Sequence, residues 1–125
     1  MSLLLDAGAF IAFERGNRTV QAFLERAARS GEAVRTTVGV IAQVWRRGSA
    51  QSKLSRLLRG VAEVPMDGAS GRRTGILLGR AKLADVVDGA LIDAARDGDE
   101  ILTSDWNDLV RLAAAAEKTL IITPI

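Results

Sequence analysis

An aspartate directly after three leucines is the first residue of this sequence that suggests chemistry. Asp6 follows Leu3-Leu4-Leu5, a run that is too short for a helix and suits a buried strand. A buried carboxylate without a partner is costly, so Asp6 needs a basic side chain, several backbone donors or a metal ion. No basic side chain lies close in the sequence, because the nearest charged residue is Glu14. A metal ion is therefore one of few explanations for this acid.

Two further pairs of acids share the pattern Asp-x-x-Asp at the start of a predicted helix. They are Asp85 with Asp88, and Asp105 with Asp108. An N-cap aspartate accepts hydrogen bonds from free backbone N–H groups, and a second acid in the first turn complements the helix dipole. From the pattern alone, capping is the more frequent explanation and metal binding is the alternative.

The chemistry of a joint site depends on which side chains the chain lacks. It contains no cysteine and no histidine, so thiol nucleophiles, zinc–thiolate sites and the commonest general base are excluded. If Asp6, Asp88 and Asp105 converge, their repulsion raises their pKa values unless a cation lies between them. Oxygen ligands alone favour Mg²⁺ or Mn²⁺ over zinc. Such a site suits hydrolysis of a phosphodiester by water that a metal ion activates.

Short apolar runs alternate with amphipathic stretches, and this alternation predicts the elements that position the acids. Strands are expected at residues 3–5, 33–37, 61–64, 101–103 and 120–122. Helices are expected at residues 9–14, 20–28, 40–46, 52–58, 69–81, 86–95 and 106–116, the fifth of them capped by Asp67.

This order predicts an α/β fold, in one domain over residues 1–125. We expect a central parallel sheet of about four to five strands with helices on both faces. Ligands of such sheets bind beyond the carboxyl ends of the strands. Asp6 and Asp105 each follow a predicted strand, so both are expected at that edge.

The bulk composition narrows the class of protein. A chain of 125 residues, 48% hydrophobic and 26% charged, matches an ordinary globular domain. No apolar run approaches the ~20 residues of a membrane span. The N-terminus has neither the basic stretch nor the long apolar core of a signal peptide. We therefore expect a cytoplasmic protein.

The distribution of charge indicates a partner more clearly than the net charge of +2 does. The segment from residue 46 to residue 59 contains five basic residues and no acid: Arg46, Arg47, Lys53, Arg56 and Arg59. A surface that faces phosphates and a solvated helix face both explain such a run. For Arg46 and Arg47 we favour phosphate binding.

Trp45 and Trp106 lie close in sequence to the proposed site residues. Stacking on an unpaired base would use such a side chain. Packing in the core is the more frequent role of an aromatic residue in an apolar helix, and we expect it here.

At the acidic positions the sequence resembles the PIN-domain family. Residues 3–11 resemble its opening strand and catalytic aspartate, and residues 85–92 resemble its central acidic helix start. Residues 101–109 resemble its late strand, which ends in Thr-x-Asp. The order and spacing hold over nearly the whole chain, and the length is that of the compact VapC-type toxins.

The resemblance implies a parallel sheet wrapped by helices, Mg²⁺ or Mn²⁺ in an acidic pocket, and endonucleolytic cleavage of RNA. By position, Asp6, Asp88 and Asp105 would be catalytic and would hold the metal directly or through water. Asp108 and Asp85 would be outer ligands or helix caps. The resemblance also implies a homodimer and an antitoxin that blocks the site.

One position departs from the family pattern. PIN domains usually place a glutamate on the helix after the second strand, where this chain has Gln43. The segment Ala-Gln-Val-Trp-Arg is similar to that of a subgroup of VapC-like proteins. Glutamine loses a negative charge but keeps a carbonyl acceptor and adds two donors. We expect Gln43 to bind a water or a phosphate oxygen in a weaker metal site.

The leading hypothesis is thus a metal-dependent endoribonuclease that is the toxin of a toxin–antitoxin pair. A PIN-like module that binds RNA or a protein without cutting is the second hypothesis, and Gln43 supports it. A phospho-accepting receiver domain needs an acid after its third strand, where Val64 is followed by Pro65. A haloacid dehalogenase needs Asp-x-Asp, which Asp6-Ala7-Gly8 does not provide.

Overall fold

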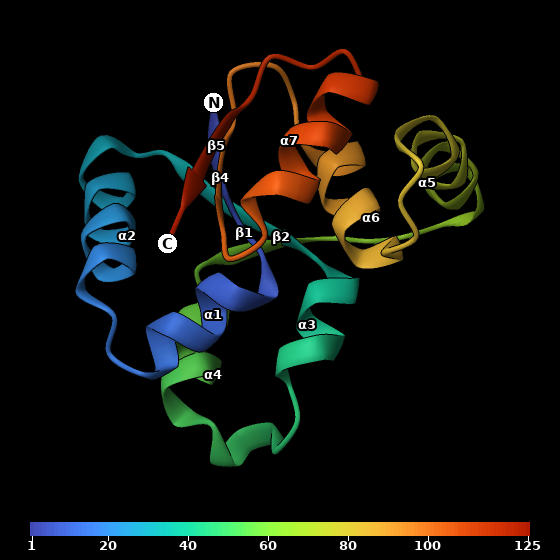
Figure 1. Cartoon of the computed structure of the whole chain (residues 1–125). Helices are drawn as coiled ribbons and strands as arrows, with labels where there is room; N and C mark the ends of the chain where they lie inside the picture. Colours follow the sequence, from blue (N-terminus) through green and yellow to red (C-terminus); the bar gives the residue numbers. More distant parts are fainter.

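The computed structural model describes residues 1–125, which form five strands, seven α-helices and one short 3-10 helix (Figure 1). The strands are β1 (Ser2–Leu5), β2 (Ala33–Thr37), β3 (Val61–Val64), β4 (Glu100–Thr103) and β5 (Ile121–Pro124). The helices are α1 (Ala7–Glu14), α2 (Arg18–Ser30), α3 (Val38–Val44), η1 (Gly48–Ala50), α4 (Ser52–Leu58), α5 (Gly68–Ala81), α6 (Val86–Ala94) and α7 (Trp106–Ala115).

The five strands form one sheet in which every pair is parallel, as the sequence predicts. The strand order is β3-β2-β1-β4-β5, so the first strand of the chain lies in the middle. Leu3 lies opposite Val34 of β2, and Leu4 lies opposite Ile101 of β4. The chain moves outward from β1 to β3 and then returns to the other side of β1. The strand order therefore reverses between β1 and β4, where parallel sheets bind their ligands.

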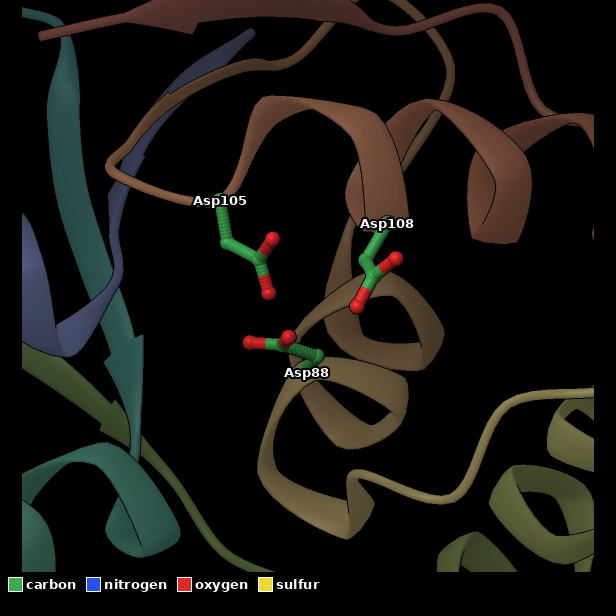
Figure 2. A group of neighbouring side chains, drawn as sticks. All are labelled: Asp88, Asp105 and Asp108. Atoms are coloured by element: carbon green, nitrogen blue, oxygen red, sulfur yellow. The ribbon is translucent and has the colours of Figure 1, made fainter.

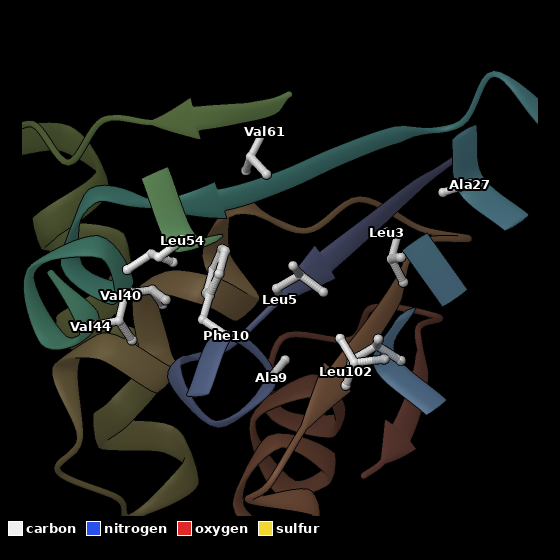
Figure 3. Close-up of a cluster of buried hydrophobic side chains, with 11 residues drawn as sticks. Leu3, Leu5, Ala9, Phe10, Ala27, Val40, Val44, Leu54, Val61 and Leu102 are labelled. Atoms are coloured by element: carbon white, nitrogen blue, oxygen red, sulfur yellow. The ribbon is translucent and has the colours of Figure 1, made fainter. Parts of the chain in front are cut away.

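Helices cover both faces of the sheet, because successive residues of β1 point to opposite sides. Leu3 and Leu5 belong to a core shared with α1, α2, α3 and α4, in which Phe10 is fully buried (Figure 3). Leu4 belongs to a second core, shared with α5, α6 and α7. None of the helices combines the length and the apolar composition that a membrane span requires.

The largest shift of a predicted helix concerns the third one, expected at 40–46 and found at Val38–Val44. Thr37 ends β2 and also caps α3, since its hydroxyl accepts a hydrogen bond from the N–H of Val40 at 3.3 Å. The strand therefore continues into the helix without a loop. The predicted cap of α5 is confirmed, because the Asp67 carboxylate accepts from the N–H of Ser70 at 2.8 Å.

Candidate metal centre

Three carboxylates converge beyond the carboxyl ends of β1 and β4. Asp88, Asp105 and Asp108 each offer an oxygen, and these oxygens all lie within 4.8 Å of one another. Figure 2 shows the three side chains directed toward a common point, one from α6 and two from the start of α7. All three residues are partly buried. We call this group the acidic cluster.

Asp88 belongs to the cluster because its neighbour takes the capping role. Asp85 is the N-cap of α6, and its carboxylate accepts a hydrogen bond from the N–H of Asp88 at 3.0 Å. Asp85 is exposed and lies outside the acidic cluster. In this pair, capping explains the first acid and leaves the second one free.

Asp105 stands at the N-cap position of α7, yet its carboxylate makes no capping hydrogen bond. Its own backbone N–H donates to the hydroxyl of Thr103 at 2.7 Å. The carboxylate therefore remains available to the cluster, together with that of Asp108 in the first turn of the helix. Capping, the more frequent explanation, does not account for Asp105.

Asp6 is buried as expected, at 5% exposure, and its partners are donors of the chain itself. One oxygen accepts from the N–H of Ala9 at 2.8 Å and thereby caps α1. The other accepts from the hydroxyl of Thr103 at 2.6 Å and from the N–H of Ser104 at 3.1 Å. Burial raises the pKa of Asp6 although these hydrogen bonds act in the opposite direction. Hydrogen bonds thus explain this acid without a cation, and it lies beside the acidic cluster rather than inside it.

The electrostatics of the cluster are most visible at Asp88. The pKa of Asp88 is raised to about 8, chiefly because the carboxyl is buried. A hydrogen bond with the Asp105 side chain and the charges of Asp85, Asp105 and Asp6 contribute to the same rise. None of the three ion pairs in the structure includes a residue of the cluster. A group of uncompensated carboxylate oxygens fits the ligand preference of Mg²⁺ and Mn²⁺.

Two neighbours of the cluster have roles that the sequence did not reveal. Thr103 is fully buried, and its hydroxyl links Asp6 to the backbone of Asp105. A Cβ added to Gly8 would lie 2.5 Å from the Cβ of Ser104, so this position has room only for glycine. The Thr-x-Asp pattern marks Thr103, but its contact with Asp6 spans 97 residues and no local pattern predicts it.

The other predicted site residues lie on α3 and the turn that follows it. The side chain of Gln43 is exposed and forms no hydrogen bond, while its backbone carbonyl accepts from the Arg46 guanidinium at 3.1 Å. Arg46 and Arg47 are exposed, and neither takes part in an ion pair. The expected core position of the two tryptophans is wrong, since Trp45 is 39% and Trp106 is 45% exposed.

Comparison with known proteins supports the fold through structure and not through sequence. No protein-family model matches the chain, and no curated protein matches it. A solved structure does match: a chain in the crystal structure of VapBC2 from Rickettsia felis aligns with a TM-score of 0.74. That structure contains VapBC2 bound to a DNA fragment from its promoter. The alignment covers 100% of this chain and 99% of that chain at 14% sequence identity. The fold predicted from the sequence is thus confirmed: this chain is an α/β protein whose five-stranded parallel sheet matches that of a PIN domain.

Proposed function

We propose that this protein is a Mg²⁺- or Mn²⁺-dependent endoribonuclease. The observation that carries the proposal is the convergence of Asp88, Asp105 and Asp108 at the edge where parallel sheets bind ligands. Burial is the main cause of the raised pKa of Asp88, and the neighbouring carboxylates of Asp85, Asp105 and Asp6 also raise it. A divalent cation would counteract both effects. When bound, the cation supplies stabilisation of the negative charge on a phosphodiester and lowers the pKa of water.

The acids in and around the cluster have different proposed roles. Asp88, Asp105 and Asp108 would hold the cation with their own oxygens. Asp6 keeps unused lone pairs, so it can still bind the cation directly or through water, and its bonds to Thr103 fix the loop before Asp105. Asp85 serves mainly as the cap that orients α6.

Substrate contacts are proposed for the amide and guanidinium groups on α3 and on the turn that follows it. Gln43 would bind a water or a phosphate oxygen with its free amide, which has no partner within the chain. Arg46 and Arg47 would bind phosphates of the RNA, because their charges are not compensated by any ion pair.

The biological role we propose is that of the toxin in a toxin–antitoxin pair, acting in the cytoplasm as a homodimer that an antitoxin blocks. The full-length likeness to a chain of VapBC2 supports this role. The sequence resemblance to VapC-type toxins points in the same direction.

The test is cleavage of a single-stranded RNA by the purified protein with Mg²⁺, with Mn²⁺ and with a chelator. We expect cleavage with either metal, none with chelator, and at least about a 100-fold loss in Asp88→Asn, which removes one ligand and its charge. Glu25→Gln is the matched control, because Glu25 is an exposed acid on α2 with no hydrogen bond. Cleavage that persists in chelator, or equally in Asp88→Asn, would contradict the proposal.

A PIN-like module that binds RNA without cutting is the second candidate, and the exposed, uncharged Gln43 favours it. Gln43→Glu separates the two candidates. For an enzyme, the added carboxylate is expected to change Mg²⁺ affinity or the cleavage rate. RNA binding without cleavage in both the natural protein and Gln43→Glu would favour the binding module.

A further inference from the structure

A shallow groove beside the basic segment is not used by the acidic cluster. It has a volume of about 350 Å³ and is lined by Ile41, Trp45, Ser55, Leu58, Arg59 and Glu63. Its side chains come from α3, α4 and β3 and from the turn after α3. The indole of Trp45 is partly exposed there, although tryptophan is the largest side chain available for a core.

Three exposed cations border this groove, and we call them its rim. Arg59 lines the groove, and Arg46 and Arg47 directly follow Trp45 in the chain. Lys53 of the same basic segment lies instead over the Phe13 ring. The ion pairs of the structure all lie elsewhere, at Arg26, Arg35 and Arg73. The helix α4 contains no acid that could compensate its cations, and Glu63 is the one acid that lines the groove. A ligand with regularly spaced negative charges would complement this rim.

A buried side chain fixes the turn that presents Trp45 and the two arginines. The amide oxygen of Gln51 accepts from the N–H of Arg46 at 3.0 Å and from the N–H of Arg47 at 2.8 Å. Its amide nitrogen donates to the Val44 carbonyl at 3.0 Å and to the Glu14 carboxylate at 3.1 Å. The backbone of the turn is therefore ordered before any ligand arrives, which lowers the entropic cost of binding.

We propose that the groove binds a single-stranded segment of RNA, with one base stacked on Trp45 and the adjoining phosphates on Arg46, Arg47 and Arg59. The proposal rests on RNA being the substrate of the acidic cluster. Helix α3 starts at the carboxyl edge of the sheet and runs away from it (Figure 1). Its residue Ile41 and the following Trp45 line the groove. With seven residues the helix is about 10 Å long. Near the start of α3, Gly39 lies against Val87, which precedes Asp88, and Trp45 follows the other end of this helix. Helix α3 therefore connects the acidic cluster with the groove.

An unpaired base suits the apolar part of this surface, because every base has a flat face that stacks on an indole. The phosphates next to that base then meet the cations of the rim. The carboxylates of an acidic protein segment would satisfy the charges, but they offer no extended aromatic face to Trp45. The combination of a partly exposed indole and unpaired arginines therefore favours RNA.

The experiment measures binding in chelator, so that it does not depend on cleavage. Trp106→Phe leaves Trp45 as the single tryptophan of the chain. A 2′-O-methylated single-stranded oligonucleotide is expected to quench its fluorescence. Fluorescence anisotropy of a dye-labelled copy of the oligonucleotide measures the Trp45 variants, which have lost this signal. Trp45→Ala should weaken the affinity roughly 5- to 100-fold, and Trp45→Phe, which keeps a stacking ring, should recover most of it. Ile76→Ala is the control, since Ile76 is an exposed apolar side chain on α5.

Salt dependence distinguishes the base contact from the phosphate contacts. Arg59→Ala is expected to lower the slope of log affinity against log salt by about 1, whereas Trp45→Ala leaves the slope unchanged. Arg29→Ala, an exposed cation on α2, is the matched control.

Unchanged affinity in Trp45→Ala would overturn the inference, as would an absence of RNA binding in chelator. Equal quenching by a polyglutamate peptide of the same charge would also overturn it, in favour of an acidic protein segment. The protein could also bind RNA through Trp45 and yet cleave no RNA with Mn²⁺. That result would contradict the proposed nuclease activity and support the RNA-binding role of the groove.

Discussion

At the scale of single residues, Asp88 links the charge of the acidic cluster to the stability of the protein. Its pKa is about 8 in the folded chain, against an ordinary value of 3.8. The folded state therefore binds this proton more tightly than the unfolded state does. The resulting stabilisation is fully present below pH 3.8 and is lost as the pH rises through 8.

Replacing Asp88 by Asn should remove that loss. In chelator, we expect the free energy of unfolding of the natural protein to fall by about 1–3 kcal/mol between pH 4 and pH 8. The expected fall is this small because Asp88 is partly exposed and solvent screens its interactions. Asp88→Asn should show a smaller fall and should be the more stable protein at pH 8. Urea unfolding at both pH values checks this, with Glu25→Gln as the control. Parallel pH profiles of the variant and the natural protein would show that Asp88 titrates normally.

Thr103 is the residue that connects Asp6 to Asp105. Thr103→Val keeps the shape of the side chain but removes the hydroxyl that donates to Asp6 at 2.6 Å. We expect Mg²⁺ affinity to fall by about 10-fold, because groups behind a metal ligand typically contribute that much. Isothermal titration calorimetry measures it.

Thr36→Val is the matched control for this variant. The Thr36 hydroxyl is also buried and donates to the Leu5 backbone carbonyl at 2.8 Å, and it makes no hydrogen bond to a carboxylate. Both variants should lose about 1–3 kcal/mol of stability, but only Thr103→Val should weaken metal binding. Equal Mg²⁺ affinity in the two variants would exclude a positioning role for Thr103.

At the scale of elements, local patterns predicted more of the fold than of the site. The strands at 33–37 and 61–64 and the helix at 52–58 have the predicted bounds, because apolar periodicity and turn residues determine them locally. The predicted end of the last strand is wrong by two residues, since β5 continues to Pro124. Proline is tolerated there because β5 is an edge strand, where one side of the backbone has no partner.

The two Asp-x-x-Asp segments show where local patterns stop being informative. Asp85 caps its helix and Asp105 does not, although the spacing is identical. Next to Asp105, the Thr103 hydroxyl accepts from the N–H of Asp105 and donates to Asp6, a contact that Asp85 lacks. Asp6 and Thr103 are 97 residues apart, and only the pairing of β1 with β4 brings them together. Sequence reasoning could identify candidate acids but not which of them the fold leaves free.

The turn between α3 and α4 should depend on the contact between Gln51 and Glu14. Gln51→Glu places two carboxylates side by side and removes the donor to the Val44 carbonyl, so we expect a loss of about 1–3 kcal/mol and weaker RNA binding. Glu14→Gln in the same chain restores an amide–carboxylate pair and should recover part of both. A double-mutant cycle measures the coupling, and simple additivity would rule out the contact as the anchor of the turn.

At the scale of the whole molecule, the acidic cluster joins two helices that pack on the same face of the sheet. Asp88 belongs to α6, while Asp105 and Asp108 belong to the start of α7. A cation shared between them would stabilise the folded state and leave the unfolded chain unaffected. Binding of this kind adds about 2.7 kcal/mol when the free ligand is at 100 times its Kd.

Thermal unfolding with increasing Mg²⁺ should therefore show a rising Tm. For a chain of this length we expect an increase of about 10 °C at 100 times the Kd. Asp88→Asn should show little or no increase, and Glu25→Gln should behave like the natural protein. A Tm that does not respond to Mg²⁺ or Mn²⁺ in the natural protein would exclude tight metal binding.

The position of β1 in the middle of the sheet also has a consequence during synthesis. One neighbour of β1 is β4, which begins at Glu100. A ribosome that adds about 5–20 residues per second completes β4 roughly 5–20 s after β1. Until then Asp6 has neither Thr103 nor Asp105 beside it, and the acidic cluster does not exist. The proposed nuclease activity therefore cannot reach the messenger RNA that is being translated until β4 and the start of α7 have emerged from the ribosome.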